Sequence, residues 1–131
     1  MTAFSNFLEN KILDHTLRGS AGAYTAPTTV YIALFTAAPT DANSGTEVTG
    51  GSYARQTITF GSAASSGAIS NTATVTFPTA TANYGTVTHI GLYDALTTGN
   101  LLYHGAVTVS KTITTGDTFS IAVGNLTITL D

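Results

Sequence analysis

Two of the three histidines in this chain lie close together in the sequence, in the stretch "THIGLYDALTTGNLLYHG" at residues 88–105. His89 and His104 flank Asp94. Imidazole and carboxylate groups are common ligands of zinc and common agents of proton transfer. The stretch therefore raises two possibilities: a metal or catalytic site, or a β-hairpin that carries two isolated histidines.

The spacing of the two histidines favours the hairpin. A two-residue turn in "LTTGN" pairs Tyr93 with His104 and His89 with Thr108 across the ladder. The histidines then share a face of the sheet but lie roughly 13 Å apart, at about 3.3 Å per residue. Two imidazoles that share a zinc ion must each bring a nitrogen to within about 2.1 Å of it. We therefore expect neither a metal site nor a Ser–His–Asp arrangement in this stretch.

Other catalytic signals in the sequence are weaker. The chain has no cysteine, which excludes disulfides, thiolate metal sites and cysteine nucleophiles. The stretch "DANSGTE" offers oxygen ligands but lacks the ordered spacing of a calcium loop, and no lysine follows the glycine-containing turns as in a phosphate loop. We expect no enzyme activity, no cofactor and no bound metal. The seven carboxylates form no evident pair: Glu9, Asp14, Asp41, Glu47, Asp94, Asp117 and Asp131.

The composition indicates a single all-β domain spanning residues 1–131. Charged residues make up only 8% of the chain, whereas about 25% is usual. Its 27 threonines and 10 serines supply the polar surface instead. Threonine is β-branched and suits the solvated face of a pleated sheet.

Charge and hydropathy exclude several classes of partner. Only four basic residues are present, they form no cluster, and the net charge is −3, so we expect no nucleic-acid partner. No apolar run approaches the length of a membrane span, and the N-terminal residues lack the pattern of a signal peptide. We therefore expect no membrane partner.

The stretch "TAFSNFLENKILDHTLRG" predicts the only helix, within residues 1–19. Thr2 is its predicted N-cap and Gly19 its stop. Leu13 and Leu17 widen its apolar stripe. Such a helix must bury this stripe against its own domain or against a partner subunit. Four apolar residues at offsets 0, 3, 4 and 8 define the stripe: Phe4, Phe7, Leu8 and Ile12.

Residues 28–131 predict a jelly-roll-like β-sandwich or barrel of about eight strands. Alternating and continuous apolar patterns place the strands at 29–37, 53–60, 71–78, 86–95, 100–110, 112–115, 117–123 and 125–130. Residues 38–52 form a long polar loop. The predicted core consists of Val30, Ile32, Leu34, Ile58, Phe60, Val75, Phe77, Ile90, Leu92, Leu102, Phe119, Ile121, Leu126, Ile128 and Leu130.

Several long motifs occur in a characteristic order. They are "FSNFLENKILDHTLRG", "VYIALFTAAPTD", "EVTGGSYARQTITF", "ISNTATVTFPTATANYGTVTHIGLYDA" and "GNLLYHGAVTVSKTITTGDTFSIAVGNLTITL". In this order they resemble a family of small virion proteins of tailed bacteriophages, whose members are commonly labelled tail fibre proteins. Some members are similar to capsid cement or decoration proteins with a jelly-roll-like fold. The resemblance covers nearly the whole chain and implies a structural role in the virion, without catalysis.

Two functions are compatible with this resemblance. The first is a capsid decoration or cement protein on the capsid exterior, which binds the major capsid protein and stabilises its lattice. The second is a tail-associated fibre or adsorption protein that binds a host surface, for which a glycan is a candidate ligand. Fibre proteins are usually long and shafted, so the compact pattern of this chain favours decoration. In either case we expect a homo-oligomer, with three copies as the predicted number.

The helix and the loop 38–52 are the features that a self-contained sandwich explains least. A loop of this length without a strand pattern is typical of a functional segment. We therefore predict oligomer or lattice contacts at Phe4, Phe7, Leu8, Ile12, Asp41, Asn43 and Glu47.

Overall fold

The computed structural model describes residues 2–130; Met1 and Asp131, the ends of the predicted domain, lie outside the described residues. The predicted class is confirmed: the chain is mostly β with one N-terminal α-helix, and ten strands are described rather than about eight. In chain order the elements are β1 (Thr2–Phe4), α1 (Asn6–Leu17), the 3₁₀ helix η1 (Gly19–Gly22), β2 (Val30–Ala37), β3 (Thr46–Glu47), β4 (Gln56–Ile58), β5 (Ala68–Ser70), β6 (Val75–Thr76), β7 (Gly85–Tyr93), β8 (Leu101–Ile113), β9 (Ser120–Ile121) and β10 (Thr127–Thr129).

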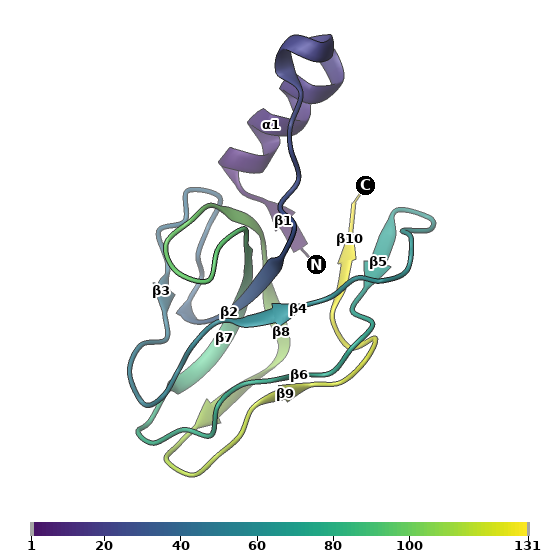
Figure 1. The fold of residues 1–131 in the computed structure, drawn as a ribbon. Coiled ribbons are helices and arrows are strands. Elements are labelled where there is room, and N and C mark those ends of the chain that lie inside the picture. Colours follow the sequence, from purple (N-terminus) through teal and green to yellow (C-terminus); the bar gives the residue numbers. More distant parts are fainter. Residues whose placement is uncertain (1, 131) are drawn as a thin grey trace.

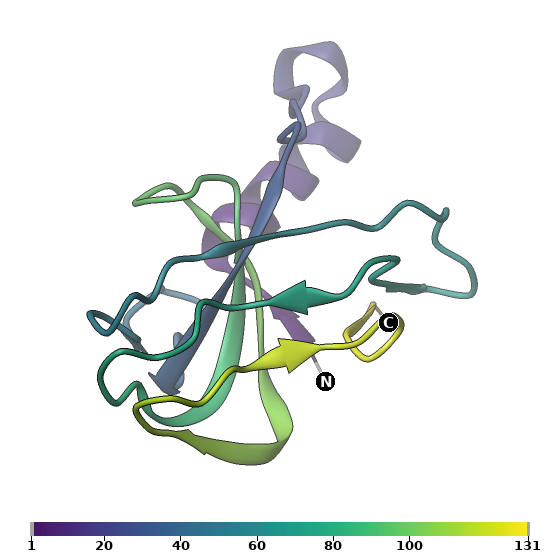
Figure 2. The same cartoon turned by 60° about the horizontal axis from the view of Figure 1, so that its bottom comes forward.

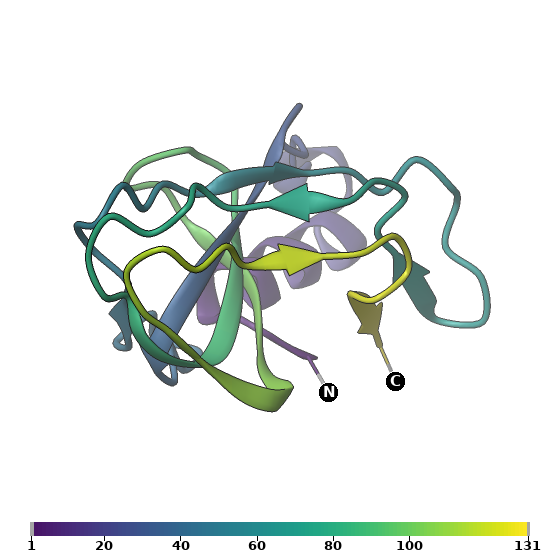
Figure 3. The ribbon, with the colours of Figure 1, turned by 90° about the horizontal axis from the view of Figure 1, so that it is seen from below.

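A six-stranded antiparallel sheet forms the centre of the body. Its order is β1-β8-β7-β2-β3, and β4 also pairs with β2. Two small sheets, β6-β9 and β5-β10, complete the fold. Seen from below, β6 and β9 cross one side of the large sheet, while α1 lies behind its other side (Figure 3). This two-sided cover explains why the apolar run of β2 is continuous rather than alternating.

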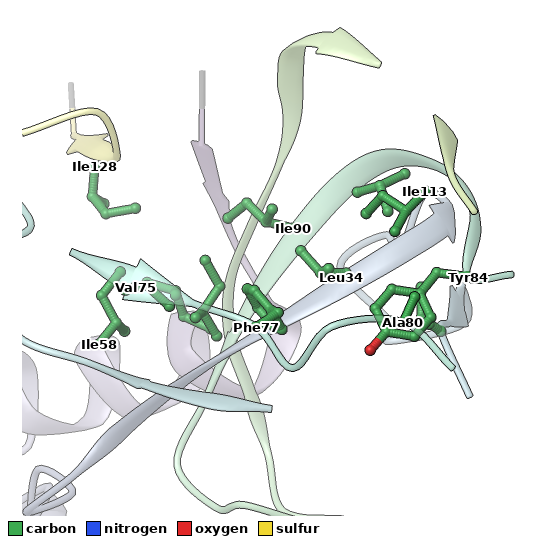
Figure 4. Packing of buried hydrophobic residues seen from close by; sticks show 13 residues of the cluster. Leu34, Ile58, Val75, Phe77, Ala80, Tyr84, Ile90, Ile113 and Ile128 are labelled. Carbon is green, nitrogen blue, oxygen red and sulfur yellow. The ribbon is translucent and has the colours of Figure 1, made fainter. Parts of the chain in front are cut away.

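The two faces of β2 contribute to two separate apolar clusters. Ile32 and Leu34 belong to the main core, which lies between the large sheet and the crossing strands (Figure 4). Ala33 and Phe35 belong to a smaller cluster with Tyr93 and Leu101. Every strand residue between positions 32 and 35 is therefore buried.

The predicted core is largely confirmed. Leu130 is the exception: it is 46% exposed, because it follows the last residue of β10. The sequence pattern missed Tyr84, which precedes β7, Val87 within β7, and Ile113 at the end of β8. The buried members of the prediction are Ile32, Leu34, Ile58, Val75, Phe77, Ile90, Leu92, Leu102 and Ile128. The partly buried members are Val30, Phe60, Phe119, Ile121 and Leu126.

The predicted start of the helix was wrong. Residues 2–4 form β1, which pairs with β8 so that Phe4 lies opposite Tyr103. The N-cap is Ser5, whose Oγ accepts a hydrogen bond from the backbone N of Leu8 at 3.2 Å and donates one to the carbonyl of Leu101. The edge of β8 offers backbone hydrogen bonds that satisfy residues 2–4 as a strand, so the helix begins only after Ser5.

The predicted hairpin register was also wrong. β7 pairs with β8 so that His104 lies opposite Gly91, not opposite Tyr93. The turn is longer than two residues because the carboxylate of Asp94 accepts hydrogen bonds from Asn100, from the backbone N at 2.7 Å and from Nδ2 at 2.8 Å. These two bonds close a five-residue loop over residues 95–99.

A wide bulge interrupts β8 farther along. His89 lies opposite Ala106, whereas Val87 lies opposite Lys111. Residues 107–110 of β8 therefore face Thr88 alone. A bulge leaves the extra residues without ladder partners and redirects their side chains, and Val109 in this segment is 65% exposed.

Residues 6–29 form an arm that projects from the body (Figure 1). They comprise α1, η1 and a return segment that folds back on the helix. Gly22 makes this return possible, because a Cβ at this position would lie 2.2 Å from the carbonyl oxygen of Asp14. The backbone N of Tyr24 also donates to Nδ1 of His15 at 3.1 Å. Within residues 2–130, no helix has the length and apolar character needed to cross a bilayer.

Candidate functional site

The two hairpin histidines lie nearer to each other than the sequence predicts. Since His89 lies opposite Ala106, His104 is its diagonal neighbour, at a typical Cα distance of roughly 7–8 Å. Each imidazole has a separate partner, however. Nε2 of His104 lies 2.8 Å from Oδ1 of Asp41, and Nδ1 of His89 lies 2.8 Å from Oγ1 of Thr88. Residues 2–130 contain no group of three histidines and carboxylates that could hold a metal ion.

Arg55 forms the most extensive polar cluster in the body, which the sequence pattern did not indicate. Its side chain is only 8% exposed. Nε and Nη2 donate to the carboxylate of Glu47 at 2.9 and 2.8 Å, and Nη1 donates to the carbonyl oxygens of Ala95 and Thr98 at 2.9 and 2.8 Å. The guanidinium carbon lies 3.6 Å from the ring centroid of Tyr93. Arg55 therefore joins the hairpin loop to the edge of the sheet.

Electrostatics stabilise this cluster as an ion pair. Burial by itself lowers the pKa of Arg55, but the hydrogen bond and the charge of Glu47 outweigh it and raise the pKa overall. Burial also raises the pKa of Tyr53, and the neighbouring charge of Glu47 adds to this effect. The Tyr53 hydroxyl therefore stays protonated; it donates to Glu47 at 2.9 Å and accepts from the backbone N of Leu34 at 3.0 Å. The contacts of Glu47 are thus internal.

The other two predicted loop residues also make contacts within the chain. Oδ1 of Asn43 accepts from the hydroxyl of Tyr93 at 2.6 Å. Asp41 contacts His104 through its carboxylate, and its backbone oxygen accepts from the N of Asn6 at 2.9 Å. These bonds hold the loop against β7, β8 and the start of α1. Asp41 and Asn43 remain solvent-exposed.

Most side chains of the predicted apolar helix face are buried or half-buried against other parts of the same chain. Phe4 lies on β1 rather than on the helix, and its ring centroid is 5.2 Å from that of Tyr103. Leu8 is buried at the base of the arm. Phe7 and Ile12 are half-buried. Of the predicted face, little is left free for a partner.

The free apolar surface of the arm lies on two other leucines. Leu13 is 55% exposed and Leu17 is 76% exposed. They are four residues apart, so they occupy the same side of α1. We call these two side chains the arm surface. The sequence contained this signal, because both leucines extend the apolar stripe.

A groove of about 720 Å³ separates the arm from the body. The hairpin loop forms one wall and the return segment another. Burial raises the pKa of Tyr24 in this groove, and the charge of Asp94 adds to the effect. Aromatic, hydroxyl and charged groups therefore face the same space. Its lining includes Phe7, Lys11, Tyr24, Thr28, Tyr31 and Asp94.

Comparison with known protein families connects this fold to bacteriophage virions. A search among curated proteins found no match to the chain. The family described as podophage GP4 fiber I protein gp80 matches residues 3–129, which is nearly the entire sequence. The predicted resemblance is thereby confirmed at the level of a phage virion family. The chain belongs to the podophage GP4 fiber I protein gp80 family and is a structural protein of the virion.

Proposed function

We propose that this chain is a homo-oligomeric subunit of a tail-associated fibre and that the arm surface joins its copies. The observation that carries the proposal is the exposure of Leu13 and Leu17 on an element that projects from the body. Apolar anchors of this kind supply most of the affinity in protein interfaces. The family description, which names a fibre protein, supports a position on the tail. Three copies are the proposed number.

Capsid decoration is the second candidate. Residues 2–130 form a compact body with one arm and contain no elongated shaft (Figures 1 and 2), which suits a knob on the capsid exterior. The low content of charged residues also suits docking onto a lattice, because burying a charge at an interface is costly. The partner in this case is the major capsid protein.

Changing both Leu13 and Leu17 to Asp is expected to abolish assembly of the purified protein. The two carboxylates would have to be desolvated at the interface, whereas in the free subunit they remain in water. Light scattering after gel filtration measures the mass, which should fall to that of the 13.4 kDa monomer. Val123→Asp is the control, since Val123 is similarly exposed but lies on the body.

A wild-type protein that is already monomeric, or a double variant that assembles normally, would contradict the role of the arm surface. Counting copies per purified particle then separates the two positions on the virion. Tens of copies, with intact heads and lost adsorption in the arm variant, support the fibre. Hundreds of copies, with heads that lose their resistance to heat, support decoration.

A fibre subunit that contacts the host needs a receptor site, and the groove between arm and body suits a neutral saccharide. Tyrosine rings offer stacking surfaces for sugar rings, and hydroxyl and carboxylate groups can bond the sugar hydroxyls. We expect Tyr31→Ala to weaken binding of host surface polysaccharide about tenfold, equivalent to about 1.4 kcal/mol. Titration calorimetry with isolated polysaccharide is the measurement. Tyr31→Phe keeps the ring and should retain most of the affinity; equal losses in both variants would contradict stacking.

A further inference from the structure

A hollow of about 510 Å³ with both apolar and polar lining lies on the body, between β8 and the C-terminal segment. Its apolar lining comes from Val107 and Val109 on one side and from Phe119, Ile121 and Leu126 on the other. The β8 bulge brings Val109 to this lining, where it stays 65% exposed. A monomer gains nothing from leaving such a surface in water.

The arm of the same chain is too far away to fill this hollow. The arm tip lies above the body, whereas β9, beside the hollow, lies in the lower half of the body (Figure 1). The arm surface and the hollow are thus two separate features of one subunit, each with apolar side chains. The arm surface projects from the subunit, whereas the hollow is a depression in its body, so the shapes of the two features are complementary.

The charges beside the two features are opposite in sign. Glu9 precedes Leu13 by four residues and therefore lies on the same side of α1. Lys111 lines the hollow. Neither residue belongs to an ion pair within residues 2–130. In a contact between copies, Glu9 of one copy would face Lys111 of the other.

We infer that Leu13 and Leu17 of one copy dock into the hollow beside Val109 of the next copy. The inference rests on the proposed role of the arm and names the surface that receives it. The contact is head-to-tail, since two different surfaces meet. Such a contact closes into a ring when the rotation between copies permits, as in a trimer, and otherwise propagates as a filament.

Cysteine cross-linking tests the pairing directly, because the chain has no cysteine of its own. Two variants are prepared separately, Leu13→Cys and Val109→Cys, and are mixed under mild oxidation. We expect a disulfide-linked dimer in the mixture and little cross-linking in either variant alone. The control mixture pairs Leu13→Cys with Val123→Cys, whose valine is 58% exposed but does not line the hollow.

Several outcomes would overturn the inference. Homodimers of Leu13→Cys alone would mean that arms meet arms, which leaves the proposed function standing but removes the hollow as the receiving surface. Equal yields of disulfide-linked dimer in the Val109→Cys and Val123→Cys mixtures would mean that the cross-links form by random collision of subunits and not at a specific contact. If Val109→Asp leaves assembly intact while the Leu13 and Leu17 changes abolish it, the arm keeps its proposed role but the hollow is not the surface that receives it.

A charge exchange gives an independent readout. Glu9→Lys and Lys111→Glu are each expected to weaken association about fivefold, the upper range for an exposed ion pair. The double variant should recover most of this loss, because the two charges are then exchanged. If the losses of affinity caused by the two single substitutions add in the double variant, Glu9 and Lys111 are not in contact between copies.

Discussion

Replacing Phe77 with alanine is expected to lower the free energy of unfolding by about 3–5 kcal/mol, the range for truncating a buried aromatic side chain. Phe77 is 1% exposed and lies at the centre of the main core (Figure 4). Its ring is stacked on Tyr53, with centroids 6.0 Å apart, and meets Phe119 edge-on at 5.9 Å. Alanine would leave a cavity at the place of the Phe77 ring, next to the rings of Tyr53 and Phe119. Denaturation in urea measures the loss.

Phe60→Ala is the matched control, since Phe60 packs against the same core but is only partly buried. Its loss should be clearly smaller, because less apolar surface leaves the core. A loss below about 1 kcal/mol for Phe77→Ala would contradict the observed packing, because such a value is typical of surface positions.

Replacing Arg55 with alanine should cost about 3–5 kcal/mol, as expected when one partner of a buried ion pair is removed. The change leaves Glu47 without its counter-charge and removes the Nη1 group that donates to the carbonyl oxygens of Ala95 and Thr98. We also expect faster hydrogen exchange in residues 95–99, because Arg55 holds this loop. Thermal unfolding and hydrogen exchange measure the two effects.

The ion pair between Arg18 and Asp14 provides the comparison for Arg55. Its charged atoms are 3.4 Å apart, and the side chains are 61% and 41% exposed. Arg18→Ala should therefore cost only about 0–1 kcal/mol. Similar losses for the two arginines, or unchanged exchange in residues 95–99 of the Arg55 variant, would contradict the structural role of Arg55.

Sequence patterns were sufficient to predict the fold class and most of the core. Alternation at Val75 and Phe77 placed both side chains inward, and the period of 3.6 after Phe4 indicated a helix. These patterns arise because the side chains of one element repeat with the geometry of that element. The absence of cysteine depends on composition alone, so it too could be stated from the sequence.

The positions of the candidate contact residues were predicted only in part. All four apolar candidates were placed on the helix, but Leu8 proved buried and Phe4 proved to lie on a strand. The partners of Asp41 and Arg55 were not predictable, since His104 is distant in sequence from Asp41, and the Ala95 carbonyl is distant from Arg55. A local sequence pattern shows that a side chain is polar, but it does not show which distant group will form a hydrogen bond or ion pair with it.

The strand register, the ion pair of Arg55 and the hollow beside Val109 depend on the tertiary structure. β1 is a strand because the edge of β8, about a hundred residues later, offers it hydrogen bonds. The β8 bulge exposes Val109 because the register between β7 and β8 shifts by three residues between Val87 and His89. Local periodicity depends on neighbours in the sequence, whereas register, bulges and free surfaces depend on which distant backbone and side-chain groups satisfy one another.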